Sequence, residues 1–165
     1  MRDKISIERV ESLHPKVRNI FKSFIEEIEA TFNITVRVAQ AGRTFAEQQA
    51  IWNEGRTTPG PNVRPGHPLG DVVTWAIPGT SYHNYFLAID AIPFKTDGKT
   101  LDWNYDFHKW VPIATKYGIT CGINFPPHKT DADHFELTFG HNWRQLLDKY
   151  HRGDFIEGTK YVNIF

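Results

Sequence analysis

The strongest constraint on the fold of this chain is one carboxylate inside an apolar strand. Residues 87–92 have the composition of a buried strand, and Asp90 lies at its centre. A carboxylate in such a place is rarely left unpaired, and Ala88 and Ile92, its neighbours on the same face, carry no charge. Asp90 therefore requires either a salt bridge or a metal ion supplied by another part of the chain.

Two short stretches, residues 81–90 and 131–136, together contain the groups of a catalytic zinc site. Such a site needs three protein ligands, a fourth position for a water whose pKa falls to about 7, and a base that is not a ligand. The stretches supply two imidazoles, His83 and His134, together with Asp90 and a spare carboxylate, Asp131.

The spacing of these residues bears on their placement. His83 and Asp90 are seven residues apart and would face opposite sides of one strand, so we expect His83 on the loop that enters the strand. A structural ion pair for Asp90 and a hydrogen-bonded core position for His134 are the alternatives. Asp131, three residues before His134, favours the metal because a loop there can present a carboxylate to the same ion.

Composition narrows the class of protein. A length of 165 residues fits one domain with a substantial core. Lys plus Arg and Asp plus Glu number 19 each, so bulk charge favours neither nucleic acid nor acidic lipid, and a small uncharged or zwitterionic substrate is expected. Cys121 is the only cysteine, which excludes an intramolecular disulfide and a Cys-rich zinc site. Any metal must be held by nitrogen and oxygen.

The first residues of the chain contain no apolar stretch typical of a signal peptide, and no segment approaches the ~18 apolar residues of a membrane span. The expectation is a monomeric cytoplasmic protein with no membrane anchor.

Periodicity predicts alternating helices and strands. Apolar residues spaced by three and four from Val17 to Ile28 predict an amphipathic helix, and alternation over residues 34–38 predicts a strand. Thr44 and Glu47 have capping-box spacing, so a helix over about 45–54 is expected with Arg43 just outside its start. The other expected elements are a helix over 106–117 interrupted at Pro112, a strand over 134–139 and a helix over 142–150.

Residues 57–70 interrupt this pattern with four prolines and three glycines, which predict a long surface loop. A lid over a substrate and a merely tolerated insertion are equally open interpretations.

The motifs carry a family resemblance. The chain contains S-x-H at residues 81–83, Asp90 seven residues after the histidine, and D-x-x-H at residues 131–134. This pattern resembles the zinc D-alanyl-D-alanine carboxypeptidase and dipeptidase family, most closely its phage L-alanyl-D-glutamate endolysins. Residues 42–48 (GRTFAEQ), 52–60 (WNEGRTTPG), 81–85 (SYHNY) and 161–163 (YVN) resemble that endolysin branch in the same order.

The resemblance implies a role for each matching position. It makes His83, Asp90 and His134 the zinc ligands and Asp131 the general base. It also implies that Arg43 faces the oxyanion of the transition state, where a fixed cation contributes several kcal/mol. Gln48 and Ser81 would bind polar groups of the substrate, although a helix-surface glutamine and a turn serine are equally good interpretations of those two.

Two positions depart from the family pattern. Phe86 occupies the glycine position of H-x-x-G-x-A-x-D, which affects how closely the backbone can approach its neighbour. Residues 121–125 (CGINF) replace W-G-G-x-W, so one wall of the substrate cleft differs. Cys121 in this apolar setting is interpreted as a packing residue and not as a nucleophile.

The prediction is therefore an α+β fold like that of the hedgehog and D,D-peptidase domains, with residues 1–165 as a single catalytic domain. A small, mainly antiparallel sheet would hold Zn²⁺ on one face, with helices on the other. The expected activity is hydrolysis of a peptidoglycan stem-peptide bond, L-alanyl-D-glutamate first and D-alanyl-D-alanine as the alternative.

A non-catalytic zinc-stabilised binding module, as in the hedgehog domain, is the alternative of another class. Asp131 and Arg43 argue against it, because a binding site has no use for a base and an oxyanion donor. The endolysin resemblance implies that the enzyme remains in the cytoplasm until permeabilisation of the membrane gives it access to peptidoglycan.

Overall fold

The computed structural model describes residues 1–165, which form two compact units. Residues 1–42 and 86–139 make up the first, here called the sheet unit. Residues 43–85 and 140–165 make up the second, here called the helical unit. Each unit is therefore assembled from two separate stretches of the chain.

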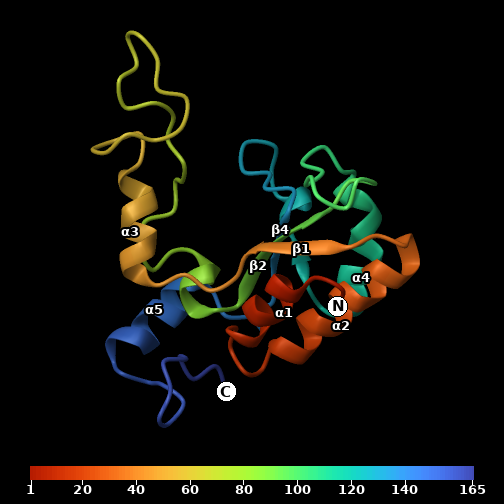
Figure 1. Ribbon diagram of the computed structural model, residues 1–165. Coiled ribbons are helices and arrows are strands. Elements are labelled where there is room, and N and C mark those ends of the chain that lie inside the picture. Colours follow the sequence, from red (N-terminus) through yellow and green to blue (C-terminus); the bar gives the residue numbers. More distant parts are fainter. The chain divides into compact units, whose positions relative to one another are not determined.

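The sheet unit contains four strands in the order β1-β2-β4-β3, with every neighbouring pair antiparallel (Figure 1). The strands are β1 (Val36–Gln40), β2 (Ala88–Pro93), β3 (Thr120–Cys121) and β4 (His134–Glu136). Its helical segments are α1 (Lys4–Glu11), α2 (Arg18–Phe32), η2 (Phe107–Trp110), α4 (Val111–Lys116) and η3 (Gly122–Asn124). The predicted α+β class with a small antiparallel sheet is confirmed.

The core of this unit lies on one face of the sheet. The ring of Phe135 is fully buried and contacts Phe24 of α2 and Trp110 of η2, with centroid distances of 5.2 and 5.6 Å. Because side chains alternate along a strand, His134 and Glu136 lie on the opposite face. The helices therefore cover one face and leave the other to the polar residues of β2 and β4, as the sequence predicted.

The helix expected over 106–117 is interrupted at Pro112 as predicted: η2 ends and α4 begins there, because proline is accepted only in the first turn of a new helix. Two other local features of the sheet unit differ from prediction. The strand expected over 134–139 ends at Glu136, and Phe139 has the left-handed φ of 50°. Helix α1 was not predicted, since its exposed Ile5 and Ile7 obscure any apolar stripe.

The helical unit contains α3 (Phe45–Asn53), the short η1 (Tyr82–Tyr85) and α5 (Trp143–His151). The capping boxes predicted at the starts of α3 and α5 are both present. Phe45 stacks on Tyr150 at 4.3 Å and meets Tyr85 edge-on at 6.1 Å, so one aromatic cluster joins the three helical elements.

None of the helices has both the length and the apolar character that a membrane crossing requires.

Candidate metal centre

The polar face of the sheet brings Asp90 and His134 together. They are direct partners in the antiparallel register of β2 and β4, and Ala88 is the partner of Glu136. The Nδ1 atom of His134 lies 3.1 Å from Oδ1 of Asp90, and its Nε2 atom lies 3.0 Å from Oε2 of Glu136. One imidazole is thus placed between two carboxylates by strand pairing alone.

The electrostatics of this group favour a cation. Burial lowers the pKa of His134, but the hydrogen bonds and charges of Asp90 and Glu136 outweigh burial and raise the pKa to about 10. Two carboxylates with 21% and 13% side-chain exposure therefore stabilise positive charge at this position. A divalent cation would supply that charge and leave the imidazole neutral, as a metal ligand must be.

His83 is held by backbone contacts within the helical unit. Its carbonyl oxygen accepts the N–H of Arg43 at 2.9 Å, and its own N–H donates to Oγ of Ser81 at 3.4 Å. The next residue, Asn84, accepts the N–H of Gly79 at 2.9 Å and donates to the carbonyl of Arg43 at 3.1 Å. His83 lies on η1, outside the strand, as its spacing from Asp90 predicted.

His83, Asp90 and His134 form a group that could hold a metal ion, because one ligand atom from each lies within 4.8 Å of the others. Neighbouring ligands of a tetrahedral zinc at about 2.0–2.2 Å are about 3.5 Å apart, which is within the 4.8 Å of this group. Two imidazoles and one carboxylate are also a ligand set of catalytic zinc sites. The residues present therefore fit Zn²⁺.

Asp131 begins the turn that leads into β4. Its N–H donates to the carbonyl of Gly122 at 3.1 Å, and its own carbonyl accepts the N–H of His134 at 3.2 Å. Its side chain is exposed, and its role as the general base stays a prediction.

Asp133 is an acidic residue of this turn that the sequence interpretation missed. Burial and the charges of Asp90 and Asp131 raise the pKa of Asp133 to about 6, and its carboxyl shares a hydrogen bond with Asp131. Its carbonyl accepts the N–H of Ala91 at 2.9 Å, which fastens the turn to β2. The presence of two acidic residues, Asp131 and Asp133, just before His134 could have indicated this second carboxyl group.

Arg43 and Gln48 are in contact at the start of α3. The Nη1 atom of Arg43 donates to Oε1 of Gln48 at 2.9 Å, and Nε2 of Gln48 donates to the carbonyl of Ala76 at 2.7 Å. Gln48 is fully buried, so the interpretation as a helix-surface glutamine is wrong. Gln48 orients the guanidinium, whereas substrate binding by Gln48 and Ser81 stays a prediction.

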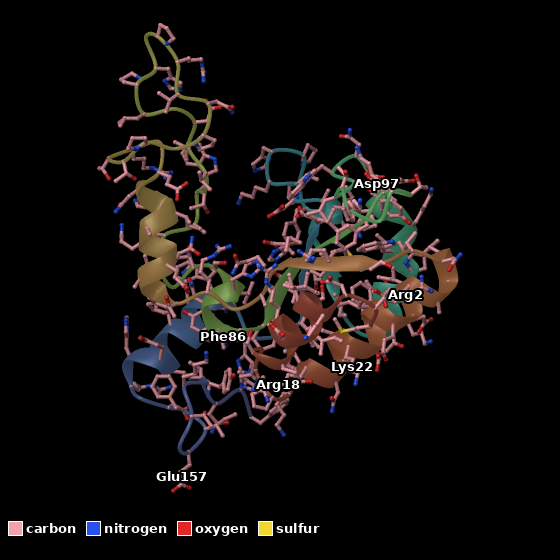
Figure 2. The ribbon with its side chains drawn as sticks, viewed as in Figure 1. Arg2, Arg18, Lys22, Phe86, Asp97 and Glu157 are labelled. Carbon is pink, nitrogen blue, oxygen red and sulfur yellow. The ribbon has the colours of Figure 1, made fainter.

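The departure at Phe86 has a clear structural consequence. Phe86, labelled in Figure 2, has the left-handed φ of 61°, which explains why glycine suits this position. A Cβ atom on Gly42 would lie 1.7 Å from Cδ1 of Phe86, so the ring occupies the space of an absent side chain. The carbonyl of Phe86 accepts the N–H of His14 at 3.0 Å. Phe86, just before β2, is thus held in its left-handed conformation by the contact of its ring with Gly42 and by the hydrogen bond of its carbonyl to His14.

Cys121 lies opposite Phe135 in the β3–β4 register and is 3% exposed. Burial raises the pKa of its thiol to about 11. A thiol that stays protonated at neutral pH is a poor nucleophile, which supports its interpretation as a packing residue.

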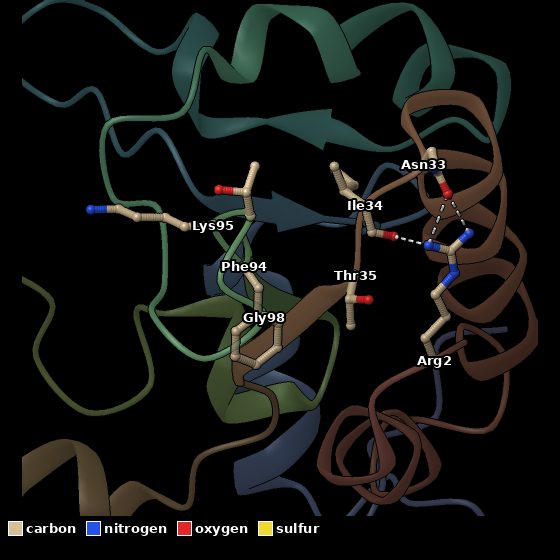
Figure 3. A pocket seen from close by; sticks show the side chains of 8 residues that line it. Arg2, Asn33, Ile34, Thr35, Phe94, Lys95 and Gly98 are labelled. Atoms are coloured by element: carbon tan, nitrogen blue, oxygen red, sulfur yellow. Dashed lines mark hydrogen bonds between the residues drawn. The ribbon is translucent and has the colours of Figure 1, made fainter.

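A cavity of about 220 Å³ elsewhere in the sheet unit contains none of these residues. Figure 3 shows that Arg2 donates to Asn33 and to the carbonyl of Ile34, whereas the Lys95 ammonium points away from Arg2. The two cations do not converge, so the cavity lacks the geometry of an anion site.

Comparison with known proteins agrees with the geometry. No protein-family model matches the chain. The peptidoglycan L-alanyl-D-glutamate endopeptidase CwlK of Bacillus subtilis is 33% identical over 134 residues, which cover 76% of this chain and 73% of CwlK.

Two solved structures share the fold at low sequence identity. The L-Ala D-Glu endopeptidase ChiX of Serratia marcescens has a TM-score of 0.54 at 19% identity, with 82% of this chain and 88% of ChiX covered. The vancomycin resistance D,D-pentapeptidase VanY, solved as a variant in complex with Zn(II), has a TM-score of 0.53 at 16% identity, with 82% and 78% covered.

Proposed function

Since the chain belongs to the family of zinc D-alanyl-D-alanine carboxypeptidases and L-alanyl-D-glutamate peptidases, we propose that it hydrolyses the L-alanyl-D-glutamate bond of the peptidoglycan stem peptide. The protein is a zinc peptidoglycan peptidase, and the choice of bond follows the 33% identity to CwlK. The observation that carries the proposal is the group His83, Asp90 and His134 with the acidic turn beside it.

The three grouped residues would hold the zinc, which when bound supplies a water of lowered pKa and polarises the scissile carbonyl. Asp90 and His134 are presented by paired strands and His83 by the hydrogen-bonded η1. Glu136 accepts a hydrogen bond from the second ring nitrogen of His134 and so orients the ligand.

Asp131 is proposed as the general base. It begins the turn that leads into β4, its backbone is bonded to Gly122 and His134, and it lies three residues before the ligand His134 without being a ligand itself. It would take a proton from the attacking water and deliver it to the leaving amine.

Arg43 is proposed to stabilise the oxyanion. Its guanidinium is oriented by the buried Gln48, and a cation that is fixed in advance needs no reorganisation when negative charge develops. A freely rotating surface arginine would not offer this advantage.

The test is digestion of purified peptidoglycan followed by mass spectrometry of the fragments. Wild type should release stem peptides with a new D-glutamate amino terminus. Loss of terminal D-alanine instead would assign the D-alanyl-D-alanine bond, and no cleavage of any wall type by the zinc-loaded protein would favour a binding module.

Asp131→Asn is the variant that tests the base. We expect a loss of ~10²–10⁴-fold in turnover with zinc content and melting temperature retained, because the amide is nearly isosteric but cannot accept the proton. Asp133→Asn and Glu136→Gln are the matched controls, and both should lose less. Collapse of activity in either control with full activity in Asp131→Asn would reassign the base.

A further inference from the structure

Gly122 lies directly against the acidic turn. A Cβ atom added to Gly122 would be 2.2 Å from the carbonyl oxygen of Asp131 and 3.0 Å from Cβ of His134. The first distance is impossible for a real side chain, whereas the second requires only a small adjustment. Gly122 does not have a left-handed φ, so this position requires glycine for space and not for backbone conformation.

The same residue also holds the turn in place. The carbonyl of Gly122 accepts the N–H groups of Phe125 at 3.0 Å and of Asp131 at 3.1 Å. The backbone of Asp131 is therefore both in close contact with Gly122 and hydrogen-bonded to it.

Asp131 and His134 are anchored differently. His134 is part of β4 and pairs with Asp90, and the neighbouring Asp133 carbonyl is bonded to Ala91 of β2. Asp131 has no strand partner and precedes this ladder. A side chain at position 122 would therefore push on the Asp131 carbonyl, whereas His134, although its N–H donates to that carbonyl, is still held by the pairing of β4 with β2.

We propose that Gly122 is a positioning residue that sets the general base relative to the metal ligands by allowing the Asp131 backbone to pack against it. The proposal rests on the proposed function, in which Asp131 is the base. It assigns a role to a residue that contributes no side chain to the site.

Gly122→Ala in the zinc-loaded enzyme tests the proposal. We expect kcat to fall by about 10²-fold, since a misplacement of about 1 Å can cost this much, with KM and zinc content little changed. Lys22→Ala, at an exposed position on α2 away from the grouped ligands, is the control and should keep full activity. Undiminished kcat in Gly122→Ala, or loss of its zinc, would overturn the proposal.

A double variant shows whether Gly122 acts through Asp131. In the Asp131→Asn background, Gly122→Ala should cause no further loss of rate, because the group that it positions has already been removed. An equal loss in both backgrounds would mean that Gly122 acts on some other part of the enzyme, and the proposal would fail.

Amide hydrogen exchange followed by NMR supplies a readout that does not need activity. In zinc-loaded wild type the Asp131 amide should be protected by its bond to Gly122, and in Gly122→Ala this protection should fall while that of Ala91 remains. A fast-exchanging Asp131 amide in wild type would refute the proposal even if the variant did not fold. An inactive wild type with a protected Asp131 amide would instead count against the proposed function alone.

Discussion

The β2–β4 strand pair and the irregular segment of residues 54–81 are stabilised in opposite ways. In the strand pair, backbone pairing places the side chains of the site: Asp90 lies opposite His134, and Glu136 lies opposite Ala88. The irregular segment contains no helix or extended strand and is held by turn hydrogen bonds, isolated bridges and side-chain contacts. It is longer than the 57–70 loop predicted from prolines and glycines.

Arg56 provides much of the order in that segment. Its guanidinium donates to the carbonyl oxygens of Trp52 at 2.6 Å and Thr74 at 2.9 Å, and lies 3.5 Å from the centroid of the Trp52 ring. Gly55 and Gly60 also pack against the carbonyl of Asp71, where a Cβ atom would come within 2.4 Å.

The difference shows where this chain concentrates its rigidity. The distances between metal ligands must stay constant to within about half an ångström, and paired strands meet that requirement because several hydrogen bonds would have to break together. The irregular segment leaves Trp75 82% exposed and has no paired strands, so single substitutions should loosen it without unfolding the protein.

The largest effect is expected from removing a metal ligand. His134→Ala leaves Asp90 and Glu136 partly buried without their cation, which should cost about 3–5 kcal/mol of unfolding free energy in addition to the lost zinc. His83→Ala and Asp90→Ala should also lose zinc. Elemental analysis and thermal melting before and after chelation would check this, and full zinc in any two of the three variants would contradict the ligand assignment.

An intermediate effect is expected where the chain enters β2. Gly42→Ala places a methyl group on the Phe86 ring, so we expect a loss of about 1–3 kcal/mol in urea unfolding, as for other overpacked cores. In the Phe86→Gly background the same substitution has room and should cost less than about 0.5 kcal/mol. Equal costs in the two backgrounds would show that the ring and Gly42 do not share this space.

The smallest effect on global stability is expected in the irregular segment. Arg56→Lys loses the planar group that donates to two carbonyls and stacks on Trp52, so chymotrypsin should cleave next to Trp75 faster while the free energy of unfolding changes by less than about 1 kcal/mol. Arg64→Lys is the control, because Arg64 is 54% exposed and pairs with Asp71 near the surface. Equal cleavage of both variants would show that Arg56 does not order the segment.

Much of the site could be predicted because its signals are local in sequence. Capping boxes at Thr44 and Asn142 depend on residues three apart, and the lone Asp90 in an apolar strand indicates an unmet charge wherever the strand lies. Helix α1 could not be predicted from periodicity, because Ile5 and Ile7 are exposed and its N-cap Asp3 is stabilised from outside the helix by Arg37, which lies 34 residues away and donates to it at 2.8 Å.

The sequence by itself determined which groups are available: two imidazoles, the carboxylates of residues 90 and 131, and the arginine before α3. It determined this because residue type and spacing set ligand chemistry and the face that each side chain takes on a strand. Only the tertiary structure decided that His134 lies between two carboxylates, that Gln48 is buried while bonded to Arg43, and that Gly122 packs against Asp131. Burial and the contact between two strands depend on how separate segments pack, which local spacing does not determine.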